Sequence, residues 1–315
     1  MARAYGANAT LLAAFEQTYG VSPDPAVDDF WKLPFISTSL GSEQGLTPND
    51  LIGMGRDPSA PIRDVIKVEG DMVVPLDVRH IGLWLKALLG EPTSVGTGVV
   101  THTFASGKPS LPSLTLETGL PDIPAWFVAS GVMVNSLQVG FARSGAANAT
   151  VGLIAQGEAK QAATLDATPA SRDLIRFNQF QGAIKQGGAA LGNVVSAQLT
   201  YSNNLERIET IRSDGKIDGA DPTVASLTGN LEVRFADTTL IDAATNNTPL
   251  ELTFGYAIDA DRRLTFIAHE VYLPKPKLSI SGPGGIQATF EWQAAKAAGV
   301  ARMLTVELVN DVTTY

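Results

Sequence analysis

Hydrophobic and polar residues alternate along most of the chain with a period of two, which is the pattern of half-buried β-strands. Val, Ile, Thr and aromatic residues are concentrated in these stretches, and Gly, Pro, Asn or Asp residues separate them. The pattern predicts strands over residues 65–75, 99–104, 113–117, 132–141, 149–155, 194–202, 227–235, 250–257, 264–271, 286–292 and 303–308. We therefore expect a mainly β fold.

Helical periodicity is scarce. It is clearest over residues 77–90, which Gly90 and Pro92 end. The same pattern predicts a shorter helix over 9–17 and a weak one over 237–244. Four apolar residues share one face of the helix at 77–90, and we expect this face to pack against a sheet: Ile81, Trp84, Leu85 and Leu88.

Residues 37–63 are rich in Gly, Pro, Ser and Asn and predict a long loop. A loop of more than about 20 residues without secondary structure is uncommon inside a compact domain, and long loops are often functional. We therefore expect this segment to have a role of its own.

An internal repeat is indicated by two pairs of similar segments. The strand at 68–76 and the helix after it have a counterpart at 227–235, with an offset of 159 residues from Gly70 to Gly229. The segment 130–141 and its hairpin partner at 149–154 have a counterpart in 281–292, with a hairpin to 303–308. The offset from Gly131 to Gly282 is 151 residues. Chance resemblance between two β-meanders is the alternative explanation.

The repeat predicts two tandem β-sandwich or barrel modules, each with one flanking helix. The first module is expected over 1–160, with an N-terminal arm and the long loop at about 37–63. A linker rich in Ala, Gln and Gly follows over 161–192, and the second module covers 193–315.

Composition narrows the functional classes. A chain of 315 residues with 44% apolar and 17% charged side chains can bury a sizeable core. The absence of cysteine excludes disulfides, thiolate metal sites and cysteine nucleophiles. No uncharged apolar run approaches about 18 residues, and the first residues lack the apolar core of a signal peptide, so we expect a soluble protein without membrane association.

Charge argues against tight nucleic-acid binding. The net charge is −9, and both halves are acidic, with 10 basic against 15 acidic residues over 1–160 and 13 against 17 over 161–315. Phosphate binding requires clustered Lys and Arg. DNA could still pass the protein without being held.

No motif predicts a catalytic, cofactor-binding or metal-binding residue. The three histidines, His80, His102 and His269, are far apart in sequence. The acidic loop at 214–221 lacks the ligands of a calcium loop, and the glycines at 53 and 55 lack the third glycine of a dinucleotide fingerprint. We expect no enzyme, although carboxylates converging from separate strands would leave a hydrolase possible.

Four segments together resemble tail tube proteins of long-tailed, siphovirus-type bacteriophages. They are residues 4–11, the loop at 41–61, the strand from Val68 that leads into the amphipathic helix, and the segment 304–311. The resemblance covers nearly the whole chain through pattern and order.

The resemblance implies a structural subunit without cofactor. Such subunits form rings that stack into a tube around a tape measure protein, contact tail terminator and distal tail proteins, and let genomic DNA leave without specific binding. It also implies a location in the virion tail after synthesis in the host bacterial cytoplasm. The long loop would reach the next ring through Leu46, Asn49, Asp50, Met54, Arg56 and Asp57.

Geometry then favours a ring of six modules. If each module gives about four strands, six modules enclose a bore of about 40 Å, whereas three leave about 16 Å, less than a duplex about 20 Å wide. We therefore prefer a trimer with pseudo-sixfold symmetry, with a hexamer as the alternative if one module only decorates the outside. Carboxylates lining the lumen would repel DNA phosphates.

A β-sandwich that binds glycans or decorates the virion is the alternative function. It would need an exposed aromatic platform. The tryptophans occur instead in apolar or strand contexts, which favour core positions: Trp31, Trp84, Trp126 and Trp292.

Overall fold

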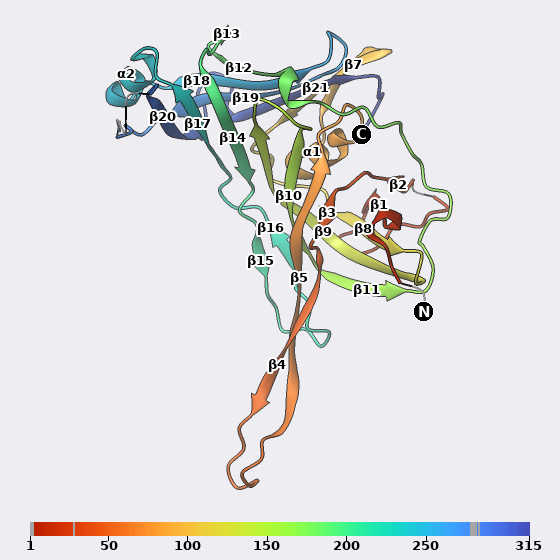
Figure 1. Ribbon diagram of the computed structural model, residues 1–315. Helices are drawn as coiled ribbons and strands as arrows, with labels where there is room; N and C mark the ends of the chain where they lie inside the picture. Colours follow the sequence, from red (N-terminus) through yellow and green to blue (C-terminus); the bar gives the residue numbers. More distant parts are fainter. Residues whose placement is uncertain (1–2, 28, 278–281, 283) are drawn as a thin grey trace.

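The computed structural model describes residues 3–27, 29–277, 282 and 284–315, and these form a mainly β protein with two α-helices (Figure 1). The strands belong to three sheets that share a core and to a long hairpin that projects from it. The alternation of buried and exposed positions along the strands follows the period of two in the sequence.

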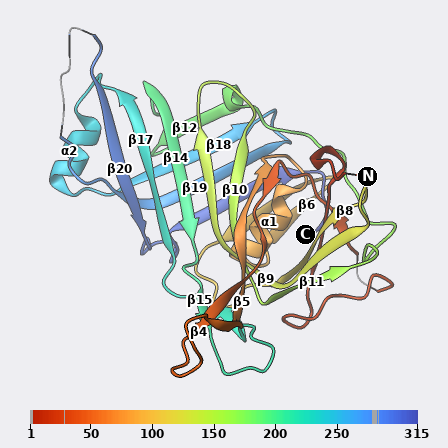
Figure 2. The same cartoon turned by 60° about the horizontal axis from the view of Figure 1, so that its bottom comes forward.

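The first sheet is antiparallel and combines strands from both halves of the chain (Figure 2). Strand β9 of the first half pairs with β14 of the second half, so the sheet is continuous between them. Its spatial order is β5 (Ser59–Pro75), β10 (Asn148–Ala155), β9 (Ala125–Phe141), β14 (Val194–Ser202), β17 (Ser226–Arg234) and β20 (Gln287–Ala295).

The second sheet crosses the upper end of the first in Figure 1. The two sheets are joined at a corner where Glu270–Tyr272 of β19 pair with the end of β20. The spatial order is β6 (Thr93–Thr97), β7 (Val99–Ala105), β21 (Leu304–Asn310), β19 (Arg263–Tyr272), β18 (Leu250–Ala257), β12 (Gly182–Gln186) and β13 (Ala189–Ala190).

The remaining strands lie at the sides of these sheets. A third sheet uses the first half of β9 and has the order β2 (Trp31–Lys32), β1 (Thr10–Phe15), β8 (Leu114–Leu120), β9 and β11 (Gly157–Gln161). The outer side of β5 is covered by β3 (Ser37–Thr38) and β4 (Gly41–Asn49), and a small hairpin is formed by β15 (Glu206–Ile208) and β16 (Gly219–Asp221).

Helix α1 (Ile81–Leu89) lies between the sheets and contacts β9 and β7. Helix α2 (Thr239–Asn246) follows β17 as α1 follows β5, so the order of strand and then helix recurs in both halves. Short 3-10 helices occur at Gly6–Asn8 and Gln179–Gln181. One core cluster contains residues from both halves, from Leu11 to Leu308.

The segment 161–192 is fastened to the rest of the protein at several places. The fully buried carboxylate of Glu117 on β8 accepts hydrogen bonds from the Thr164 hydroxyl (2.7 Å) and the Leu165 amide (2.5 Å). Further along, β12 pairs with β18 over five residues. A buried carboxylate that lost these donors would be costly, so the contact holds the segment in place.

Three expectations from the sequence are wrong. The predicted helix at 9–17 is instead strand β1 (Thr10–Phe15); residues 11–14 are buried throughout, so no alternation marks the segment as a strand. Residues 37–63 belong mostly to strands β3, β4 and β5 rather than to an unstructured loop. Strands β20 and β21 do not form a hairpin, because β21 pairs with β19 and β7. Residues 281 and 283 of the repeat lie outside the described residues.

Among the described residues, no helix combines the length and apolar character needed to cross a membrane.

Candidate assembly surfaces

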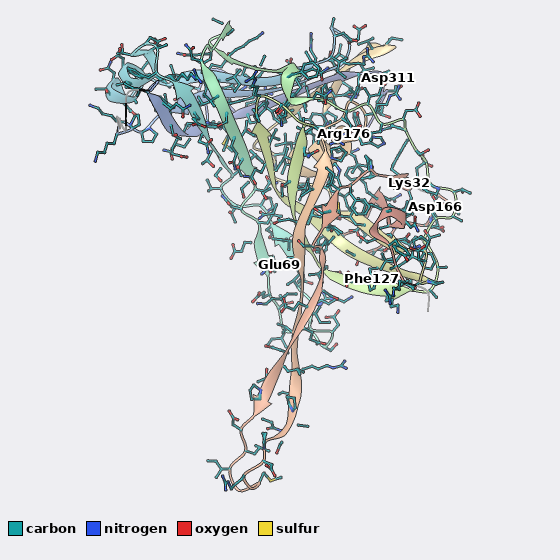
Figure 3. The ribbon with its side chains drawn as sticks, in the orientation of Figure 1. Lys32, Glu69, Phe127, Asp166, Arg176 and Asp311 are labelled. Carbon is teal, nitrogen blue, oxygen red and sulfur yellow. The ribbon has the colours of Figure 1, made fainter. Side chains whose placement is uncertain are left out.

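The most prominent surface is a two-stranded arm, formed by β4 and the first part of β5, that extends away from all three sheets (Figure 3). Glu69, labelled in Figure 3, lies where the arm leaves the first sheet. Nine residues of β4 at about 3.3 Å each give the arm a reach of about 30 Å. Nearly every arm residue from 42 to 66 is exposed, so the protein's own core does not account for this segment.

The tip of the arm is apolar. Gly53 and Gly55 have φ values of 89° and 100°, a conformation that other residues adopt only with strain, and they allow the chain to reverse there. Leu51, Ile52 and Met54 are exposed at this turn, Ile52 completely. The six residues predicted to contact a neighbouring ring all lie on the arm, and only Asn49 is half-buried: Leu46, Asn49, Asp50, Met54, Arg56 and Asp57. Large apolar side chains gathered in this way are typical of an interaction surface.

A second surface is the outward face of the first sheet, which is polar and mostly uncharged. The register places Gln138, Thr200 and Thr228 in one row across three strands, and Gln198 and Asn230 in the next. Their neighbours in sequence point inward and are buried, except for the half-buried Gly229. The face therefore presents hydroxyl and amide groups across β9, β14 and β17.

Few charges interrupt this polar face. The carboxylates at outward positions are Asp71 on β5, Glu232 on β17 and Glu291 on β20, and Arg234 is the base near the upper end of the face. At the lower end Glu69 forms an ion pair with Arg207 from β15. This face therefore carries a few acidic residues in a neutral polar background.

A third surface is the open edge of the first sheet at β20. The Phe235 amide donates to the Ile286 carbonyl (2.9 Å), so these two residues form a hydrogen-bonded pair. In an antiparallel ladder, hydrogen-bonded pairs alternate with pairs that are not hydrogen-bonded. The backbone N–H and C=O groups of residues 288, 290 and 292 therefore point toward β17. Those of Gln287, Thr289 and Glu291 point in the opposite direction, away from the edge of the sheet. No described residue pairs with β20 on that side before residue 293. Such an edge is a template for pairing with another chain.

Helix α1 is buried on nearly every side rather than on one face. Ile81, Trp84, Leu85 and Leu88, the four residues of the predicted packing face, are at most 2% exposed. Most of the opposite side is buried as well, and Lys86 is the exception. The helix is therefore a central element of the core.

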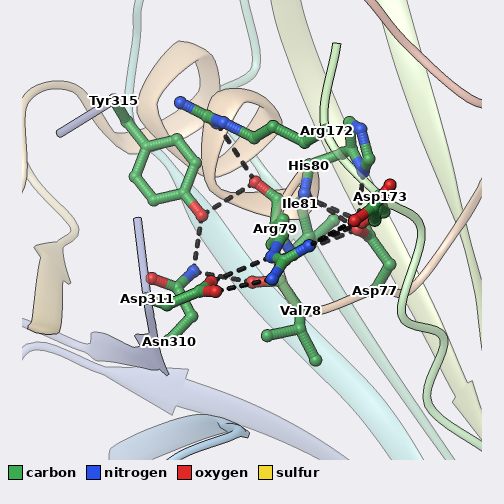
Figure 4. A network of polar contacts seen from close by, with 10 residues as sticks. All are labelled: Asp77, Val78, Arg79, His80, Ile81, Arg172, Asp173, Asn310, Asp311 and Tyr315. Carbon is green, nitrogen blue, oxygen red and sulfur yellow. Dashed lines mark hydrogen bonds and ion pairs between the residues drawn. The ribbon is translucent and has the colours of Figure 1, made fainter. Parts of the chain in front are cut away.

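A polar network joins the start of α1 to residues 172–173 and to residues 310–315, both distant in sequence (Figure 4). The fully buried Asp77 accepts hydrogen bonds from the amides of Arg79 (3.0 Å), His80 (2.9 Å) and Ile81 (3.1 Å). Arg79 pairs with Asp311, and this hydrogen bond lowers the pKa of the Asp311 carboxyl. The network therefore ties the helix to the segment 310–315.

Tyr315 completes this network. Its hydroxyl donates to the Arg79 carbonyl (2.8 Å) and accepts from the Asn310 amide group (2.6 Å), and burial raises its pKa. Its ring lies against the helix at Gly82, where a Cβ atom would come within 2.2 Å of the ring. Only glycine leaves room for this contact.

Two substitutions of Tyr315 test how much this contact contributes to the free energy of unfolding. Tyr315→Phe is expected to lower the free energy of unfolding by about 1 kcal/mol through the lost hydroxyl contacts, and Tyr315→Ala by about 3 kcal/mol through the lost ring as well. Urea denaturation followed by tryptophan fluorescence measures both. Equal values for the two variants would contradict a packing role of the ring.

The histidines have structural partners. His80 Nδ1 lies 2.7 Å from Asp77, and His269 Nε2 lies 2.7 Å from the Thr305 hydroxyl. His102 is buried between Ser94 and the Val312 carbonyl, and burial lowers its pKa. In the described part of the chain, no three His, Asp or Glu residues come together as metal ligands.

The tryptophans do not form an exposed platform. Trp84 and Trp292 are buried, and Trp31 is covered by the Arg172 guanidinium at 4.0 Å from its ring. Trp126 is half-buried on β9. This arrangement gives no support to a glycan-binding groove.

The open edge of β20 and its outward residues were not predicted from the sequence. The alternation over 286–292 identified the strand, but pairing between strands carries no local signal. The role of Asp77 was not predicted either, although a carboxylate before an apolar helical run is typical of a helix start.

Comparisons with known proteins bear on the family of this chain. A search of curated proteins found no match. The profile of the family described as phage tail tube protein matches residues 6–294, nearly the whole chain. The match spans both halves, the projecting arm and both helices. The chain therefore belongs to the phage tail tube protein family, and its role is that of a structural component of the phage tail.

Proposed function

We propose that copies of this chain close into a ring in which the first sheet of each copy lines a channel. The open edge of β20 is the observation that carries the proposal, because the sheet ends there with outward backbone groups and no partner among the described residues. The polar face of the same sheet suits a water-filled lumen. Closure would remove the exposed edge that otherwise invites uncontrolled pairing.

The partner of β20 in the ring is the opposite edge of the next copy. That edge is formed by β3 and β4, which cover the outer side of β5. The outer amide of Ser42 already has a partner, the Glu158 carboxylate at 3.1 Å, so pairing would use the residues on either side of it. Such an arrangement is a heterologous contact that closes by rotation.

The continuous sheet favours a trimeric ring. Three of its six strands come from each half of the chain, which supports a lining role for both halves. The β3 and β4 edge that pairs with β20 adds a seventh strand to each chain's share of the wall. Three chains would therefore supply about 21 strands, a backbone diameter of about 45 Å and a bore of about 35 Å, which passes a duplex about 20 Å wide. Two chains would leave about 20 Å, with no clearance around the duplex. A hexamer built from the same sheets would be much wider than DNA requires.

A neutral polar lining would let DNA pass through the channel without binding to the wall. Phosphates are held by clustered Lys and Arg, and Arg234 is the one base among the outward positions described above. Genomic DNA would therefore leave through the channel without being retained, and a tape measure protein would occupy it before ejection. Tail terminator and distal tail proteins would cap the two ends of the tube.

The arm is the contact between rings in this proposal. It carries the exposed apolar tip and reaches about 30 Å beyond the first sheet, so it can contact a copy in the adjacent ring. Residues Leu46, Asn49, Asp50, Met54, Arg56 and Asp57 would contribute to that contact.

Thr289→Pro tests ring closure. The substitution removes an outward amide of β20, and the ladder to β17 does not use this amide, so the monomer should keep its fold. We expect the wild-type chain to form rings or tubes in negative-stain micrographs and Thr289→Pro to remain monomeric, with an unchanged circular dichroism spectrum.

Thr289→Ala is the matched control, because it changes the side chain and keeps the amide. It is expected to assemble like the wild type. Normal rings from Thr289→Pro would contradict closure through β20, and a wild-type chain that stays monomeric at high concentration would contradict the proposed function.

A further inference from the structure

A groove lies at the end of the molecule opposite the arm. It has a volume of about 690 Å³ and lies where the last residues of β9, the first residues of β14, the 3-10 helix at Gln179–Gln181 and β12 meet. In Figure 1 these elements are at the top, and the tip of the arm is at the bottom. The volume is within the range of sites that bind side chains or small ligands.

The groove is held in shape by hydrogen bonds. The side-chain oxygen of Gln179 accepts from the Ala142 amide (3.0 Å) and the Tyr256 hydroxyl (2.8 Å). Its side-chain nitrogen donates to the Gly140 carbonyl (3.0 Å). A site fixed in this way loses little conformational entropy when it binds a partner.

Exposed apolar side chains line the groove. Phe180 is 73% exposed and Val195 is 37% exposed, and half-buried Ile184 and Leu191 lie with them in the lining. Side chains of this size exposed together gain free energy when a partner covers them. The apolar tip of the arm, Leu51–Met54, offers a matching surface.

The charges of the two surfaces are complementary. The described lining contains the guanidinium groups of Arg143 and Arg234 and no carboxylate, and neither arginine forms an ion pair with a described residue. From residue 43 to residue 64 the arm has four carboxylates against two arginines, a net charge of −2: Glu43, Asp50, Asp57 and Asp64 against Arg56 and Arg63. Opposite charges steer association and fix its register.

From these observations we propose that the groove receives the arm tip of a second copy of this chain in the adjacent ring. The inference rests on the proposed function and adds the receiving site to it. Because donor and receiver lie at opposite ends of one molecule, each copy binds the copy ahead and is bound by the copy behind. Such a contact does not close and extends the tube without limit.

Cysteine cross-linking tests the contact directly, because the chain has no native cysteine. The double variant Ile52→Cys/Phe180→Cys, assembled and treated with a short bis-maleimide, is expected to give a ladder of covalent multimers on a denaturing gel. The control Ile52→Cys/Val27→Cys uses another exposed apolar position outside the groove and is expected to give no ladder.

Charge reversal provides a second, independent measurement. Arg143→Glu/Arg234→Glu is expected to leave single rings and to reduce the number of tubes at least tenfold in micrographs. Adding Asp50→Lys/Asp57→Lys to the same chain is expected to restore tubes. Restoration supports a direct contact, because a folding defect in the groove would not be repaired from the arm.

The outcomes separate the inference from the proposed function. Wild-type tubes without a ladder, together with normal tubes from the charge-reversed groove, would overturn the inference and leave the proposed function standing. Normal tubes from the groove variants but incomplete tails in virions would likewise overturn it, in favour of another tail protein as the occupant. A wild-type chain that forms neither rings nor tubes would overturn the proposed function itself.

Discussion

Removal of the distal arm is expected to give a folded subunit that builds no tubes. Gln44 and Ile66 pair directly across the hairpin, so residues 45–65 can be replaced by an Asn-Gly turn that keeps the register. Nearly all of the removed residues are exposed, and none of them belongs to a core cluster. If the arm joins adjacent rings, the variant should form single rings by negative-stain microscopy and no tubes at any concentration.

A point substitution sharpens this experiment. Ile52→Asp places a charge at the fully exposed tip, where burial in a neighbour would leave that charge without solvent, and it should suppress tubes almost completely. Val27→Asp makes the same change at a position that is 77% exposed and does not belong to the arm, and should assemble normally. Tubes of normal length from the arm-deleted chain would contradict a contact between rings through the arm.

The largest loss of stability is expected for Asp77→Ala. The carboxylate is fully buried and accepts hydrogen bonds from three successive amides at the start of α1, so its removal leaves these donors unsatisfied in the core. A helix cap contributes about 1 kcal/mol and each buried unsatisfied group costs about 1–3 kcal/mol. We expect the free energy of unfolding to fall by about 3–4 kcal/mol in urea denaturation.

Helix α2 offers the matched control. Asp237 accepts a hydrogen bond from the Thr239 amide (2.9 Å) before α2, and this backbone bond lowers the pKa of Asp237. Asp237 is exposed, and water can replace the carboxylate there. Asp237→Ala should therefore cost much less than Asp77→Ala. Similar losses in the two variants would contradict the argument that burial of the donors sets the cost.

Much of the secondary structure could be predicted because apolar and polar residues alternate along half-buried strands. The strands predicted at 194–202 and 250–257 agree with β14 and β18 at both ends. Strand β1 could not be recognised, because its run Leu11–Ala14 is buried throughout and resembles a helical segment. The arm was interpreted as a loop because almost all of its residues are exposed, so no apolar face marks its strands.

The assembly surfaces depend on pairings that a local pattern cannot encode. The pairing of β9 with β14 unites the halves in one sheet, and the absence of a described partner leaves β20 open. The groove brings Arg143, Phe180 and Arg234 together from distant segments. Only the fold reveals that these residues share a surface.

The sequence by itself determined the β class, the positions of most strands and the presence of a helix within 77–90. These follow from periods of two and 3.6 residues and from turn residues, which act over short stretches of chain. The family was indicated separately, by the resemblance of four segments to tail tube proteins. The tertiary structure alone decided which strand edge is free, which face of the first sheet is polar, and that the arm and the groove lie at opposite ends. These properties depend on contacts between residues far apart in the chain, whose partners are chosen by packing of the whole core.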